Sequence, residues 1–73
     1  MTAAKLRQAV FRKPFRPLRM QLHAGDPVEV RHPEFIAITD SWVLVGQDPA
    51  PPVVFEAEMV VSIEYLDGSR AKG

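Results

Sequence analysis

The sequence predicts a mainly β protein, with an N-terminal α-helix followed by a four- to five-stranded, strongly bent antiparallel sheet or small barrel. Three observations support this prediction. Apolar residues recur at helical spacing only before the first proline, they alternate with polar residues from Leu18 onward, and Gly- and Pro-containing turns separate the short alternating runs. A sheet this small has to bend or pair, because open edges aggregate. We expect one helix-plus-β-barrel domain over residues 1–66 and a frayed tail over 67–73.

The helix is expected over roughly residues 3–12. Thr2 is a typical N-cap, because its hydroxyl can accept a hydrogen bond from a free backbone N–H of the first turn. Pro14 ends the helical pattern, since the residue before a proline avoids helical geometry. The following Pro-Phe-Arg-Pro stretch is a stiff connector, and we expect Phe15 to enter the core. One face of the helix carries the apolar residues Ala3, Leu6 and Val10.

The first hairpin follows from an even-numbered pattern. The inward-facing residues are expected to be Leu18, Met20, Leu22, Val28 and Val30. Directly opposed residues share a face of the sheet, so the connecting loop must hold an odd number of residues. A three-residue loop that ends on Gly25 in a left-handed conformation satisfies this condition. Pro27 lacks an N–H and should lie outside the ladder.

The remaining strands are separated by punctuating residues. The expected order is a break at His32-Pro33, a strand over 35–39, a turn at 40–41, a strand over 42–45, a loop over 47–52, a strand over 53–61, and a short strand or continuation over 62–66. The strand over 42–45 is apolar on both faces and should be central, with Trp42 in the core. Were Trp42 exposed, it would mark an interface hot spot. The strand over 53–61 also has apolar side chains on both faces, so the helix or another subunit must cover one of them.

The charge is sorted along the chain. All six charged residues before Asp26 are basic, whereas three basic residues and nine acids follow, a net charge of −6. A chain polarised in this way can bind a polyanion, a second copy or its own other half. The residues predicted to bind nucleic acid or an acidic partner are Lys5, Arg7, Arg12, Lys13, Arg16 and Arg19. The alternative is a solvated helix face whose phenylalanines belong to the core.

No pattern in the sequence indicates catalysis or a cofactor. The chain has no cysteine, so disulfides and thiolate zinc sites are excluded. His32 and Glu34 share a face and are compatible with zinc, but two ligands do not make a metal site. The serines lie in no nucleophile context, and the glycines form no phosphate-binding loop. We therefore expect no enzyme activity, no cofactor, no metal and no small-molecule substrate.

Location is predicted from what the sequence lacks. No apolar run approaches the ~20 residues of a membrane span. Lys5 and Arg7 are not followed by the hydrophobic region and cleavage site of a secretory signal. We expect a cytoplasmic protein that does not bind membranes.

The segment Leu22-His23-Ala24-Gly25-Asp26-Pro27-Val28 resembles the first hairpin of Sm-like proteins, which has the pattern Leu-x-x-Gly-x-x-Val and follows an N-terminal helix. The order of elements is also similar to SH3-like barrels. This resemblance implies a small barrel and, for Sm-like proteins, RNA binding. The chain lacks the second-strand glycine and the Asp-x-x-x-Asn signature of that family, and it has no asparagine, so no RNA-binding residue can be carried over.

A second resemblance covers most of the chain. Pro14-Phe15-Arg16-Pro17 after the helix and His32-Pro33-Glu34-Phe35 after the hairpin are similar to segments of short uncharacterised bacterial proteins. It implies a shared fold and no activity. The expected function is a non-catalytic interaction module that forms a homo-oligomer by edge-strand pairing or binds a protein partner. The alternative is an Sm-like RNA or DNA binder that uses the basic helix and connector.

Overall fold

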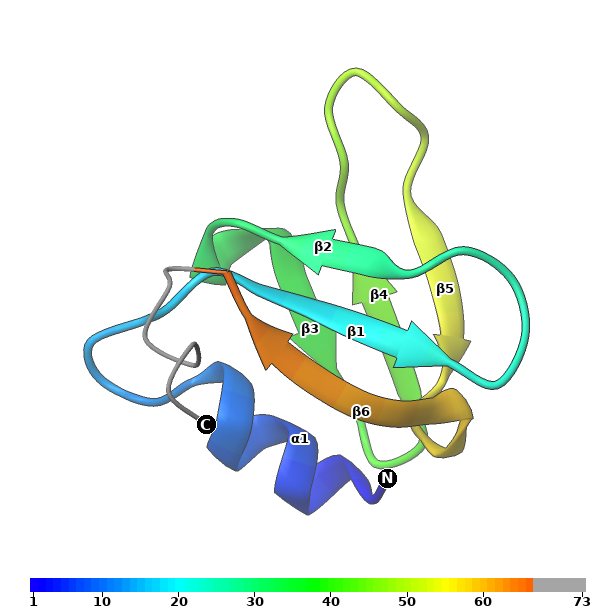
Figure 1. Cartoon of the computed structure of the whole chain (residues 1–73), viewed down its shortest axis with the longest axis horizontal. Helices are drawn as coiled ribbons and strands as arrows, with labels where there is room; N and C mark the ends of the chain where they lie inside the picture. Colours follow the sequence, from blue (N-terminus) through cyan, green and yellow to red (C-terminus); the bar gives the residue numbers. More distant parts are fainter. Residues whose placement is uncertain (67–73) are drawn as a thin grey trace.

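The computed structural model describes residues 1–66, and the expected frayed tail lies outside them. The elements are α1 (Ala3–Val10), β1 (Leu18–Leu22), β2 (Val28–Val30), the 3-10 helix η1 (Pro33–Phe35), β3 (Ile36–Ile38), β4 (Trp42–Val45), β5 (Val53–Glu56), the 3-10 helix η2 (Ala57–Met59) and β6 (Val60–Tyr65). The strands form two antiparallel three-stranded sheets in the orders β2-β1-β6 and β3-β4-β5 (Figure 1). The mainly β class with a leading helix is confirmed. Within residues 1–66 there are six strands instead of four or five, and they form no closed barrel.

Helix α1 begins as expected and ends two residues early. The Thr2 hydroxyl accepts a hydrogen bond from the Lys5 backbone N–H at 3.2 Å. Ala3, Leu6 and Val10 are buried, so the predicted apolar face is confirmed. The helix ends at Val10 because the ring of Pro14 would clash with the carbonyl of the residue four positions earlier.

The β1–β2 hairpin confirms the even-numbered pattern. Leu18 pairs with Val30 and Met20 with Val28, and all four side chains are buried. Gly25 has a φ of +86°, the left-handed conformation expected of it. The loop is longer than predicted and spans residues 23–27. Its length is still odd, and β2 begins directly after Pro27, which has no N–H for the ladder.

The predicted break after β2 is a short 3-10 helix. Pro33 opens η1, and the Phe35 backbone N–H donates to the His32 carbonyl at 3.1 Å. This turn ends the first sheet and begins the second, since β2 pairs with β1 and β3 pairs with β4. Strand β4 is the central strand of its sheet, as predicted.

The prediction of a single strand over residues 53–61 is wrong. The 3-10 helix η2 divides it, so that β5 pairs with β4 and β6 pairs with β1. The Ala57 N–H donates to the Ser41 carbonyl at 2.7 Å, which holds the turn in place. A 3-10 turn interrupts the period of two, so Val60 is buried and Val61 is 53% exposed.

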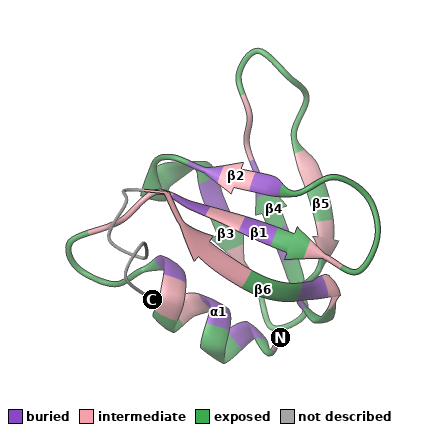
Figure 2. Ribbon diagram, viewed as in Figure 1, coloured by how far each residue is buried: buried purple, intermediate pink, exposed green. Residues whose placement is uncertain are grey.

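The core lies between the two sheets and α1 (Figure 2). Its buried members are Ala3, Leu6, Val10, Leu18, Met20, Val28, Val30, Ile36, Val43, Val45, Ala57 and Val60. Phe15 and Leu22 are half-buried against this cluster. The expectation that Phe15 enters the core from the connector is thus confirmed in part.

Candidate functional site

Arg19 lies on the solvent side of the β2-β1-β6 sheet between two acids of its own chain. Its guanidinium is 3.0 Å from Glu29 of β2 and 3.3 Å from Glu64 of β6. Both acids lie directly opposite it in the strand register. Arg31 adds a second contact to Glu29 at 2.7 Å. The hydrogen bond from Arg19, followed by that from Arg31, lowers the pKa of Glu29 below its ordinary value.

Arg7 connects α1 to the second sheet. Its guanidinium donates to the Ile38 carbonyl at 3.4 Å and lies 3.7 Å from the carboxylate of Asp40. Asp40 occupies the turn between β3 and β4. The contact therefore joins the basic N-terminal part of the chain to the acidic remainder. The charge pattern allowed this pairing within one molecule beside binding to a polyanion or to a second copy.

Arg12 and Arg16 both lie over the ring of Tyr65. The guanidinium carbons are 5.5 Å and 4.0 Å from the ring centroid, within the range of a cation–π contact. The Tyr65 hydroxyl donates to the Ala9 carbonyl of α1 at 2.9 Å. These contacts hold the end of α1 and the connector against the last strand.

The six basic residues predicted to bind a partner therefore have several roles. Arg7 and Arg19 contact acids of their own chain, Arg12 and Arg16 stack on Tyr65, and Lys5 and Lys13 are exposed. Phe11, Arg12 and Lys13 follow the last turn of α1 and are all exposed, Phe11 by 43%. We refer to these three residues as the basic elbow.

The prediction that Trp42 belongs to the core is wrong. Trp42 is 49% exposed and Leu44 is 47% exposed, whereas the alternating residues Val43 and Val45 are fully buried. Strand β4 is therefore apolar on both faces, but only one of them meets the core. The other face is open to solvent because α1 packs on the core side of the sheets.

The exposed side of β4 is continued on its neighbours. In the register, Leu44 lies opposite Ala37 of β3 and opposite Val54 of β5, which is 57% exposed. We refer to Ala37, Trp42, Leu44 and Val54 as the outer apolar face. The two-sided apolar pattern of β4 was the sequence signal for it, but that pattern did not reveal which side would be covered.

Carboxylates border one end of this face. Glu56 lies opposite Trp42 in the β4–β5 register. Asp40, Glu56 and Glu58 are all exposed and line a hollow of about 300 Å³ beside the first residues of α1. We refer to these three acids as the acidic rim.

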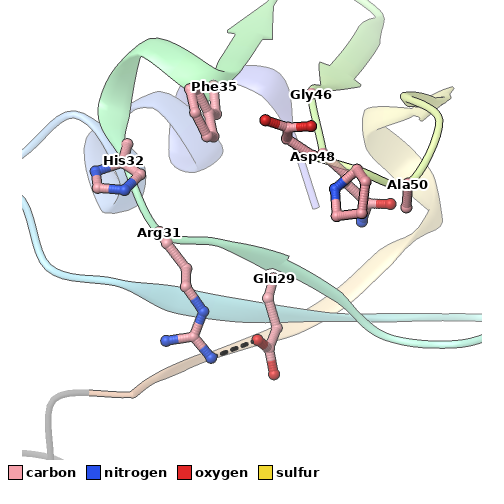
Figure 3. Close-up of a pocket in the computed structure, with 9 residues that line it drawn as sticks. Glu29, Arg31, His32, Phe35, Gly46, Asp48 and Ala50 are labelled. Carbon is pink, nitrogen blue, oxygen red and sulfur yellow. Dashed lines mark hydrogen bonds and ion pairs between the residues drawn. The ribbon is translucent and has the colours of Figure 1, made fainter.

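A larger cleft of about 480 Å³ lies between β2–η1 and the β4–β5 loop (Figure 3). Arg31, paired with Glu29, forms part of its polar wall, and Asp48 belongs to the opposite, loop wall. The His32 side chain makes no capping hydrogen bond, and its ring meets the Phe35 ring edge-on, with the two ring centroids 5.1 Å apart. Over residues 1–66, no three His, Asp or Glu side chains are grouped so as to hold a metal ion.

Comparison with models of known protein families, with curated proteins and with solved structures finds no match. Across residues 1–66, no helix combines the length and the hydropathy that crossing a membrane requires.

Proposed function

We propose that this protein is a non-catalytic interaction module that associates with copies of itself. The observation that supports this function is the outer apolar face, where a tryptophan, a leucine and a valine are each about half exposed. Exposed apolar patches of this kind, bordered by polar residues, are typical of protein–protein contacts. Tryptophan is also among the residues that most often dominate binding energy.

The size of the chain favours the same function. A 73-residue chain buries only ~60% of the surface that its unfolded state exposes, and this one has no cysteine to form disulfides. Association would add buried apolar area to a small core. Strands β5 and β6 lie at the edges of their sheets, and edge-strand pairing between copies is a further contact open to such an assembly.

Native mass tests this function directly. Sedimentation velocity over a wide concentration range should show the wild-type protein as an oligomer that dissociates on dilution. Trp42→Thr/Leu44→Thr should weaken association by ~30-fold or more, the size of a tryptophan hot spot. Val61→Thr, which changes an equally exposed strand residue on β6, should leave association unchanged. A wild-type protein that stays monomeric at millimolar concentration contradicts the proposal.

We further propose that the two sheets are an open version of the Sm-like or SH3-like arrangement. The order of elements supports it, with a leading helix, a hairpin turned by Gly25 and a second strand that bends at η1 into the other sheet. An experimental structure in which β2 and β3 do not form one bent path between the sheets would contradict it.

The second candidate function is Sm-like binding of RNA or DNA. The observation that favours it is the basic elbow, where an exposed phenylalanine precedes two exposed basic residues. Basic residues release counterions from phosphates, and aromatic rings stack on bases. Titration of a labelled single-stranded oligonucleotide should then show steep salt dependence, and Arg12→Ala should weaken binding. No binding at low salt rules this function out.

A further inference from the structure

The outer apolar face and the acidic rim form one surface with two properties. Trp42 and Leu44 provide exposed apolar area, and Glu56 lies opposite Trp42 in the register. Asp40 belongs to the turn that leads into Trp42. A partner that covers this surface must therefore bring an apolar group and positive charge close together, since buried apolar area and opposite charge have to be matched at once.

The same chain carries a surface with the complementary properties. The basic elbow presents Phe11, 43% exposed, next to Arg12 and Lys13. Arg12 reaches the Tyr65 ring at 5.5 Å, which fixes the direction of the elbow relative to the last strand. The elbow combines an aromatic ring with two cations, and both cations are exposed.

One molecule cannot bring its own elbow to its own face. The acidic rim lies beside the first residues of α1, where Met1, Thr2 and Ala3 line the hollow that the three acids share. The elbow follows the other end of α1, and an eight-residue helix separates the two by ~12 Å (Figure 1). The N-terminal ammonium of Met1 donates to the Val60 carbonyl at 2.9 Å before the first turn of α1, and the Tyr65 hydroxyl donates to the Ala9 carbonyl in the last turn. Since α1 is thus held at both ends, the two surfaces stay apart.

We propose that the basic elbow of one copy docks on the outer apolar face and acidic rim of the next copy. Phe11 covers apolar area beside Trp42, while Arg12 and Lys13 approach Glu56 and Asp40. This inference rests on the proposed self-association and names its surfaces. Because the two surfaces differ, the contact is heterologous, and repetition of it produces a ring or an open chain and not a two-fold dimer. Salt weakens the contact, because exposed charges are screened within ~10 Å.

Complementation between two variants tests the proposal. The face variant is Trp42→Thr/Leu44→Thr, and the elbow variant is Phe11→Asp/Lys13→Glu, which leaves the Arg12–Tyr65 contact intact. Each variant alone should be monomeric at concentrations where the wild-type protein assembles, with association weakened by ~30-fold or more. Mixed in equal amounts, they should form a one-to-one complex, because the elbow of the face variant fits the face of the elbow variant.

Controls keep the folding of the variants separate from their assembly. All substituted residues are exposed, so circular dichroism and urea unfolding should match those of the wild-type protein. Val61→Thr is the matched control for a lost exposed apolar residue, and it should assemble as the wild-type protein does.

The other outcomes overturn the proposal in distinguishable ways. If the elbow variant assembles like the wild-type protein and the face variant does not, the face pairs with itself and the elbow plays no part. If both variants assemble normally, association uses the sheet edges and only the named surfaces are wrong. If the elbow variant assembles normally but loses oligonucleotide binding, the elbow is a nucleic-acid surface. A monomeric wild-type protein removes the proposed function together with this inference.

Discussion

Glu29 of β2 is contacted by two arginines, Arg19 of β1 and Arg31 directly after β2. Its pKa lies below the ordinary value of 4.5, first because of the hydrogen bond from Arg19 and then because of that from Arg31. A carboxyl group whose pKa is lower in the folded state stabilises the protein above its unfolded-state pKa. That contribution is lost as the pH falls through the folded-state value.

Glu29→Gln should therefore flatten the acid dependence of stability. We expect the variant to be less stable than the wild-type protein at neutral pH and the difference to shrink as the pH falls below 4.5. Urea unfolding from neutral pH to about pH 3 measures it. Glu34→Gln, which changes an exposed carboxylate of the neighbouring 3-10 helix η1, is the control. A constant difference between Glu29→Gln and the wild-type protein across this range would contradict the assignment.

Tyr65 joins the last strand to the end of α1 through its hydroxyl and its ring. The hydroxyl satisfies the Ala9 carbonyl, one of the last carbonyls of a helix that lack a partner within the helix. Tyr65→Phe should lower the free energy of unfolding by about 1 kcal/mol, the net value of a hydrogen bond. Tyr65→Leu should lower it further, because Arg12 and Arg16 lose the ring. Equal unfolding midpoints for all three proteins would show that this contact does not hold the helix.

At the scale of elements, the β1–β2 hairpin depends on the backbone of Gly25. Its φ of +86° is strained for any residue with a Cβ, although nothing lies within 4 Å of the position where a Cβ would stand. Gly25→Ala should therefore cost about 1 kcal/mol through backbone strain alone. Gly46→Ala is the comparison, since its Cβ would make only an ordinary contact, 3.7 Å from the Phe35 carbonyl. Urea unfolding that ranks the two variants in the opposite order would contradict this account.

The elements that follow from local pattern could be predicted, and those set by tertiary context could not. Alternation places Leu18, Met20, Val28 and Val30 in the core because each strand has one covered face. Residues 53–61 keep the same alternation, yet the chain leaves one sheet at η2 and enters the other, so Val60 replaces Val61 in the core. The sequence does not signal that crossing, since Ala57–Met59 contains no glycine or proline that would mark a turn.

The candidate site could likewise be predicted only in part from the sequence. The charge pattern identified the basic residues as candidates for binding a partner. It did not show that Arg19 faces two acids directly across its sheet. That contact depends on the register of β1 with two strands, one of them 45 residues away. Trp42 was wrongly assigned to the core because an apolar strand has the same sequence pattern whether one or both of its faces are covered.

At the scale of the molecule, part of the charge polarity is used internally. Arg7 contacts Asp40, and Arg19 contacts Glu29 and Glu64, so the basic N-terminal part of the chain is joined to the acidic remainder. The basic elbow and the acidic rim remain exposed at opposite ends of α1. A molecule with complementary exposed surfaces that it cannot join within itself is suited to binding another copy.

Self-association through the outer apolar face can be followed in the emission of Trp42 measured against protein concentration, because this tryptophan is the only one in the chain and lies on the proposed contact surface. We expect the emission maximum to shift to shorter wavelength as the native mass rises, and we expect both changes to reverse on dilution or added salt. A native mass that rises while the emission stays that of a half-exposed tryptophan would contradict it, as would a mass that stays monomeric throughout.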